Sequence, residues 1–161
     1  MAIEAEQLSA IGRFAAAAEA YCSAVECEPG EAGAEMRAFA TLLATLHLGA
    51  LGLPEVSVED EPDAPSTEAT VPAQGRFANL PVALYWDVLD PLVLVPEPPV
   101  CNSLPDDLAE IYEDLKRGLA LLAAERPAAA AWEWRFHFYC HWGEHLVGAQ
   151  RAIHAWLRRG A

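Results

Sequence analysis

Apolar residues recur at spacings of three and four over two stretches near the start of the chain, which is the pattern of amphipathic helices. The first stretch is rich in alanine, a strong helix former, and ends before Pro29-Gly30. Its repeating positions are Leu8, Ile11, Ala15, Ala18, Cys22 and Val25. The second stretch ends at Gly52 and Pro54, after Met36, Phe39, Leu43, Leu46 and Ala50. The short connection between them predicts antiparallel neighbours.

The second half of the chain predicts two more helices. Ser103 can cap the first of them, which continues through an apolar stripe at Leu108, Ile111, Leu115, Leu119 and Leu122. A tight turn follows at Glu125-Arg126, and Pro127 opens a last helix that can run to about Arg159. The buried seam expected for that helix is Tyr139, Trp142, Leu146, Ala149, Ile153 and Trp156.

The region between these helix pairs has a different composition. Residues 54–78 are acidic and rich in proline, without apolar periodicity, and predict a flexible linker. Residues 80–100 are apolar, but their prolines exclude a long helix or a central strand. We expect irregular structure that caps the bundle, or alternatively a lid over a pocket, packed through Tyr85, Trp86, Leu89 and Leu92.

Together these segments predict an all-α protein. Its fold is expected to resemble a four-helix bundle, with a long acidic, proline-rich crossover between the second and third long helices. Residues 1–161 are expected to form a single helical domain, since one chain of 161 residues can bury a sizeable core.

Charge and composition narrow the classes of partner. The formal net charge of -14 repels phosphate backbones and anionic lipid, so neither nucleic acid nor a membrane surface is expected as a partner. No apolar run approaches the roughly 20 residues of a membrane span. The acidic start, Met1 to Glu6, is unlike a secretory signal, which favours the cytoplasm. The four cysteines form no CxxC pair and predict reduced thiols, with a thiolate metal or redox site as the alternative.

Acidic and histidine-rich flanks of the last two helices are predicted to face each other. The tight turn between these helices makes them antiparallel. Helical rotation places Asp107 and Asp114 on the flank that meets His145 and His141. Counting residues outward from the turn predicts which residues of the two helices lie opposite each other. The predicted pairs are Asp114 with His137, Glu110 with His141, and Asp106 with His145.

This arrangement suggests a metal site. His141 and His145 would be its imidazole ligands, and Asp107, Glu110 or Asp114 would complete it. Such a mixture of nitrogen and oxygen ligands suits the divalent metals zinc, manganese or iron. The alternative is a row of hydrogen bonds between histidines and carboxylates that only fastens the two helices together.

Two other patterns carry candidate chemistry. His141-x-x-Glu144-His145 matches the inverted zinc-protease motif, but a protease of that class requires a larger chain and a substrate cleft. Arg135 shares a helix face with aromatic residues, so it either forms an ion pair, with Asp87 or Asp90, or binds an anion inside a pocket. The residues expected at such a pocket are Arg135, Trp86 and Trp142.

Several short segments carry a family resemblance. They are Trp132-Glu133-Trp134-Arg135-Phe136, His141-Trp142-Gly143-Glu144-His145, Ala152-Ile153-His154, Tyr85-Trp86-Asp87 and 106–112. In these segments the chain resembles a bacterial family of helical proteins labelled domain of unknown function 5063. The resemblance implies a helical fold and a bacterial cytoplasmic setting, and it implies no activity.

Two hypotheses about function follow. The first is a non-enzymatic binding or interaction module for an unknown protein or small-molecule partner, acting as a monomer or homodimer. It is favoured because no complete catalytic constellation occurs in the sequence. The alternative is the divalent-metal site between the last two helices, either structural or part of a metal-dependent hydrolase.

Overall fold

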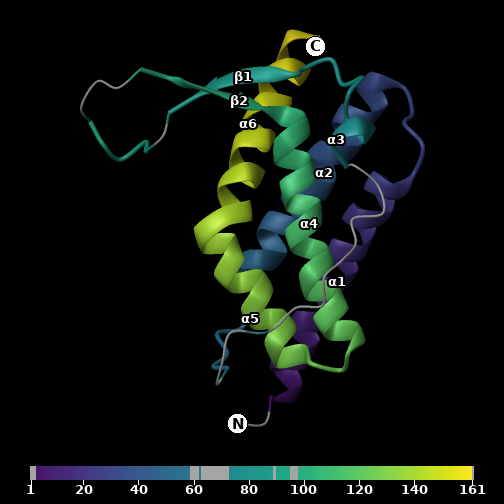
Figure 1. Cartoon of the computed structure of the whole chain (residues 1–161), viewed down its shortest axis with the longest axis vertical. Helices are drawn as coiled ribbons and strands as arrows, with labels where there is room; N and C mark the ends of the chain where they lie inside the picture. Colours follow the sequence, from purple (N-terminus) through teal and green to yellow (C-terminus); the bar gives the residue numbers. More distant parts are fainter. Residues whose placement is uncertain (1–2, 59–61, 63–72, 89, 95–97, 161) are drawn as a thin grey trace.

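Four long helical segments pack side by side in the computed structural model, which describes residues 3–58, 62, 73–88, 90–94 and 98–160 (Figure 1). They are α1 (Ala5–Glu26), α2 (Ala32–Leu51), α4 (Leu104–Ala123) and a last run made of α5 (Pro127–His137), the π-helical turn η1 (Phe138–Trp142) and α6 (Gly143–Arg159). Helix α1 packs against α2 and α4, α2 packs against α6, and α4 packs against both α5 and α6. The predicted helical bundle is confirmed. None of the described helices is long and apolar enough to cross a membrane.

Local signals explain where these helices begin and turn. The Ser103 hydroxyl accepts a hydrogen bond from the Asp106 backbone N–H at 3.3 Å and so caps α4, as the sequence predicts. The Glu31 carboxylate caps α2 by accepting from the backbone N–H groups of Gly33 and Ala34. Glu125 adopts a φ of 57°, a left-handed conformation that lets the chain reverse between α4 and α5.

The apolar stripes meet in one core. Phe14 of α1 packs against the rings of Trp134 and Trp142, with ring centroids 4.9 and 6.0 Å apart. Both tryptophan side chains are fully buried. Gly118 of α4 makes room for Trp134, since a Cβ there would lie 2.0 Å from the indole nitrogen. The described cysteines are all free thiols, and of them Cys22 is buried in this core.

The turn η1 changes which residues of the last helical run face the core. A π-helical turn contains more residues than an α-helical turn. It therefore changes which side chains of α5 and α6 lie on the same face of the helical run. Phe138 and Trp142 are buried, whereas Tyr139 is 61% exposed, so the predicted seam is wrong at Tyr139. Gly143 permits the wide turn, because a Cβ there would lie 2.0 Å from the Phe138 carbonyl oxygen.

A two-stranded hairpin lies across one end of the bundle (Figure 1). Strands β1 (Leu84–Asp87) and β2 (Val100–Ser103) pair antiparallel, with Trp86 opposite Cys101. Irregular structure was expected for this region; the hairpin forms because its prolines lie outside the two short strands.

The contacts of this region also differ from the expected ones. Tyr85 packs against the core as predicted, but Trp86 is 67% exposed and Leu92 is 86% exposed, so neither caps the bundle. Trp86 is exposed although its neighbour Tyr85 is packed, because successive side chains of a strand point to opposite faces. Leu89 lies outside the described residues.

The predicted linker over 54–78 has a packed end. Residues 59–61 and 63–72 lie outside the described residues, but α3 (Ala73–Arg76) and Phe77 pack on the bundle. Phe77 is fully buried against Phe39, with ring centroids 5.3 Å apart. The Arg76 guanidinium donates to both carboxylate oxygens of Glu35 at 2.7 Å. Residues 76 and 77 thus contact the bundle, which the sequence pattern does not reveal because a four-residue helix is too short to show apolar periodicity.

Candidate functional site

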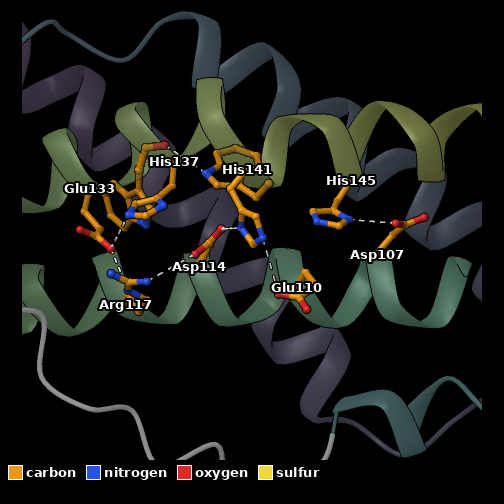
Figure 2. A network of polar contacts seen from close by, with 10 residues as sticks. Asp107, Glu110, Asp114, Arg117, Glu133, His137, His141 and His145 are labelled. Atoms are coloured by element: carbon orange, nitrogen blue, oxygen red, sulfur yellow. Dashed lines mark hydrogen bonds and ion pairs between the residues drawn. The ribbon is translucent and has the colours of Figure 1, made fainter. Parts of the chain in front are cut away.

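Histidines and carboxylates line the flank where α4 faces the last helical run (Figure 2). His137, His141 and His145 follow one another at four-residue steps, which places them along one side of a helix. Asp107 and Asp114 project toward them from α4 and are themselves buried. Burial of a carboxylate is costly unless it is paired, so these pairs are a necessary part of the fold.

His141 and Asp114 form the shortest of these contacts. The His141 Nδ1 lies 2.6 Å from Asp114 Oδ2. On the other side of the ring, Nε2 lies 3.8 Å from Glu110 Oε2, which is too long for a hydrogen bond. The two carboxylates also differ in burial: the Asp114 side chain is 7% exposed, whereas that of Glu110 is 42% exposed.

His145 and Asp107 form a second pair, which connects the helices to the hairpin. The His145 Nδ1 lies 2.9 Å from Asp107 Oδ1, and the Tyr85 hydroxyl donates to Asp107 Oδ2 at 2.7 Å. The hydrogen bond to Asp107 raises the pKa of His145, against the opposing effect of burial. Burial and the same carboxylate raise the pKa of Tyr85 well above its usual range.

The third histidine is paired within its own helical run. His137 Nε2 lies 3.4 Å from Glu133 Oε1, and the Arg117 Nε of α4 lies 2.8 Å from the same oxygen. Glu133 is 1% exposed, so this cation offsets the cost of burying its charge. Arg117 also lies 4.0 Å from Asp114 and thereby connects this group to the His141 pair.

The structure brings the five predicted metal ligands, His141, His145, Asp107, Glu110 and Asp114, to one flank, as helical rotation requires (Figure 2). Two of the three predicted pairs of a carboxylate and a histidine differ in the structure. Asp114 lies against His141 rather than His137, and Asp107 takes the place expected for Asp106, which is exposed. The pairs were predicted for a regular helix, and η1 shifts them.

The histidines and carboxylates of this flank form separate pairs. Among the described residues, no three imidazole, thiol or carboxyl side chains converge closely enough to hold a metal. Glu144, the glutamate of the protease-like motif, is exposed, and the carboxylates near the two histidines come from α4 instead. The rings of His141 and His145 lie edge to face, with centroids 4.9 Å apart.

The three residues expected at an anion pocket are not brought together. Arg135 lies over the Tyr139 ring at 5.1 Å and 3.9 Å from Glu55, not beside Asp87 or Asp90. It borders an open depression of about 290 Å³ together with Trp132 and Phe136. Trp142 is buried in the core, in the seam predicted for the last helix, and Trp86 lies on the exposed face of the hairpin because successive side chains of a strand point to opposite faces.

An exposed apolar surface on the hairpin was not expected from the sequence. The hairpin arm, which we define as the described residues of 84–103, exposes Leu84, Trp86, Val88, Leu92, Val93 and Leu94. Leu92 is 86% and Leu94 is 93% exposed. The signal that could have found this surface is the alternation of large apolar residues at 84, 86 and 88, which is typical of a strand with one free face.

The inner face of the arm is held to α4 and α6 by polar contacts. The Arg151 guanidinium lies 2.6 Å from Asp87 Oδ1 and donates to the Trp86 carbonyl at 2.6 Å. Tyr85 bonds Asp107 from the same face. Strand β1 is therefore fixed on one side and open on the other.

Comparison with known proteins identifies one family and one structural relative. A family model described as domain of unknown function (DUF5063) matches residues 7–158. The crystal structure of protein BF1032 from Bacteroides fragilis superposes with a TM-score of 0.66 over 90% of each chain, at 21% sequence identity. At this identity the likeness concerns the fold alone. No curated protein matches the chain.

Proposed function

The chain belongs to the DUF5063 family, a domain of unknown function, and we propose from its own geometry that it is a binding module that docks a protein partner through the hairpin arm. The observation that carries this proposal is the exposure of six large apolar side chains on one short arm. Large apolar side chains that gather in exposed positions on one element are typical of an interaction site.

The arm has the construction of a docking element. Leu84 and Trp86 point away from the bundle, while Tyr85 and Asp87 anchor the opposite face. An exposed tryptophan supplies a large contact area at a small cost in conformational entropy, which is why this residue is enriched where partners bind tightly. Because Tyr85 and Asp87 anchor β1, a partner would meet the outer face of this strand largely preformed.

Charge specifies the kind of partner. The chain carries a net charge of -14, and the arm adds the exposed carboxylate of Asp90 beside its apolar residues. A second copy of this chain would be repelled by the same charge. We therefore assign the surface to a protein that offers an apolar groove bordered by basic residues.

Substitutions on the arm test this proposal. Trp86→Ser and Leu94→Ser remove apolar contact area without disturbing the anchored face, and Leu48→Ser is the control, since Leu48 is 76% exposed on α2. Proteins from a bacterial extract would be captured on each variant and quantified by mass spectrometry after cross-linking. The expected result is a basic protein that cross-links to the arm, is retained by Leu48→Ser and is lost from both arm variants.

Two results would contradict the proposal. One is equal capture by wild type, arm variants and control, which would mean that the arm contributes nothing to binding. The other is sedimentation of the purified chain as a dimer that Trp86→Ser dissociates, which would assign the arm to a second copy.

A further inference from the structure

We propose that the open depression beside Arg135 binds a small aromatic carboxylate. The ring of this ligand would lie against aromatic side chains of the last helical run, and its carboxylate would pair with the Arg135 guanidinium. The depression has a volume of about 290 Å³. Pockets for drug-sized ligands begin at roughly 300 Å³, so a ligand with a single small ring system is expected. The site is separate from the hairpin arm, since α5 begins toward the opposite end of the bundle (Figure 1).

Two pairs of side chains form the aromatic and cationic parts of the site. Trp132 and Phe136 stack in parallel, with ring centroids 4.7 Å apart and an angle of 7° between their planes. Arg135 lies over the Tyr139 ring at 5.1 Å. The members of each pair are four residues apart, so they are neighbours on the surface of one helical run. Phe136 is 48% and Tyr139 is 61% exposed, which leaves surface on both rings for a ligand.

The π-helical turn η1 contributes two residues of this site. Tyr139 and Cys140 belong to η1, line the depression and are exposed. In the regular helix predicted from the sequence, Tyr139 is part of the buried seam instead. The segment after α2 adds Val56, which is partly buried against the core. Single π-helical turns are frequent at functional sites, where they redirect side chains of a helix.

The guanidinium of Arg135 has hydrogen-bonding capacity left for an anion. Within the described part of the chain it donates to the Leu53 carbonyl at 3.5 Å, which is long for a hydrogen bond. Its ionic partner Glu55 lies 3.9 Å away, and the Glu55 side chain is 89% exposed. So exposed an ion pair contributes little to stability, so a ligand carboxylate can replace Glu55 at small cost. The planar guanidinium also matches the two oxygen atoms of a carboxylate.

The combination of contacts specifies the class of ligand. An aromatic ring covers the exposed faces of Phe136 and Tyr139, and a carboxylate uses the free donors of Arg135. A single negative charge is expected because the chain carries a net charge of -14, which repels multiply charged anions such as phosphates more strongly. Indole-3-acetate, a planar ring system with one carboxylate, is therefore a suitable test compound.

Titration of the isotope-labelled protein with indole-3-acetate, followed by NMR shifts of the backbone amides, tests the site. Wild type is expected to bind one molecule per chain with a dissociation constant of about 1 mM or lower. Arg135→Gln is expected to weaken binding by about tenfold or more, because the hydrogen bonds between two charged groups are lost. Arg37→Gln is the matched control, since Arg37 is an exposed arginine of α2 and the charge change is the same. Unchanged melting temperatures show that both variants are folded.

Glu55→Gln tests the site by a gain of affinity. This substitution removes the carboxylate that competes for Arg135, so binding of indole-3-acetate should strengthen by about threefold. Indole-3-ethanol, which has the same ring without the charge, should bind wild type about tenfold more weakly than indole-3-acetate does. Its affinity should be the same for wild type and Arg135→Gln, because it has no carboxylate to lose.

Alkylation of cysteines by iodoacetamide locates the bound ligand. Cys140 lines the depression, whereas the exposed Cys27 and Cys101 lie elsewhere and serve as internal controls. Saturating indole-3-acetate should slow the alkylation of Cys140 alone, as measured by mass spectrometry.

Three results would overturn the proposal. One is the absence of amide shifts in wild type at concentrations about tenfold above the expected dissociation constant. Another is equal affinity of wild type and Arg135→Gln for indole-3-acetate, which would mean that the arginine takes no part. The third is alkylation of Cys140 at an unchanged rate, which would place the ligand outside this depression.

Discussion

The hydroxyl group of Tyr85 occupies the space that a side chain on residue 148 would need. A Cβ placed on Gly148 of α6 would lie 2.2 Å from the Tyr85 hydroxyl oxygen, so only glycine lets β1 approach the helix this closely. The same hydroxyl donates to Asp107, which pairs with His145. One glycine therefore joins the hairpin arm to the histidine and carboxylate flank.

Gly148→Ala is expected to loosen the hairpin arm. The added methyl group must displace Tyr85, at a cost of about 1 to 3 kcal/mol for overpacking. Hydrogen exchange should accelerate in 84–103, with a smaller effect on the helices. Gly12→Ala is the control, because nothing lies within 4 Å of a Cβ there and alanine favours the helix. Unchanged exchange in Gly148→Ala would show that Tyr85 does not hold the arm.

Trp142→Ala is expected to be among the most damaging single substitutions. The side chain is fully buried, and its indole N–H donates to the Trp134 carbonyl at 3.0 Å. Removal of such a side chain costs about 3 to 5 kcal/mol of unfolding free energy. Urea denaturation measures the loss, and Trp86→Ala, at an exposed position, should change stability by less than about 0.5 kcal/mol. Equal effects of the two substitutions would contradict the packing described for the last helical run.

The stability contributed by His145 is expected to depend on pH. Its folded-state pKa is raised above the ordinary value of 6.5 by Asp107. The charged histidine therefore stabilises the fold fully below about pH 6.5, and this contribution is lost as the pH rises through the raised pKa.

The difference in melting temperature between wild type and His145→Gln measures this contribution. It should be largest near pH 6 and shrink toward pH 9. His154→Gln, at an exposed position of α6, is the control and should show no such trend. A difference that grows with pH would mean that the pKa is lowered, not raised.

Substitutions in two parts of the crossover between α2 and α4 are expected to change the stability of the protein by different amounts. Replacement of residues 60–67 by a short glycine and serine link should leave the melting temperature almost unchanged, because closure entropy varies slowly with loop length. Phe77→Ala should instead cost about 3 to 5 kcal/mol, since Phe77 is fully buried. Thermal unfolding followed by circular dichroism compares them, and a large drop for the shortened link would show that its sequence contributes to packing.

The candidate site could be predicted from the sequence in its composition but not in its exact pairing. Steps of about 100° per residue along a helix place Asp114 and His141 on facing flanks. Which carboxylate meets which ring depends on the axial shift between two helices, and η1 alters that shift. Which ring nitrogen faces which carboxylate oxygen is likewise a detail that only the packed side chains supply.

The sequence by itself determined the four helical segments, because the spacing of apolar residues and the capping residue Ser103 act within a few residues of the chain. Three features were decided only by the tertiary structure: the π-helical turn, the packed segment 73–78 and the hairpin. The packed segment and the hairpin depend on contacts between distant residues, as when Arg76 meets Glu35 or Tyr85 meets Gly148. Such contacts leave no periodic trace in the sequence, since they fix single side chains rather than a repeating face.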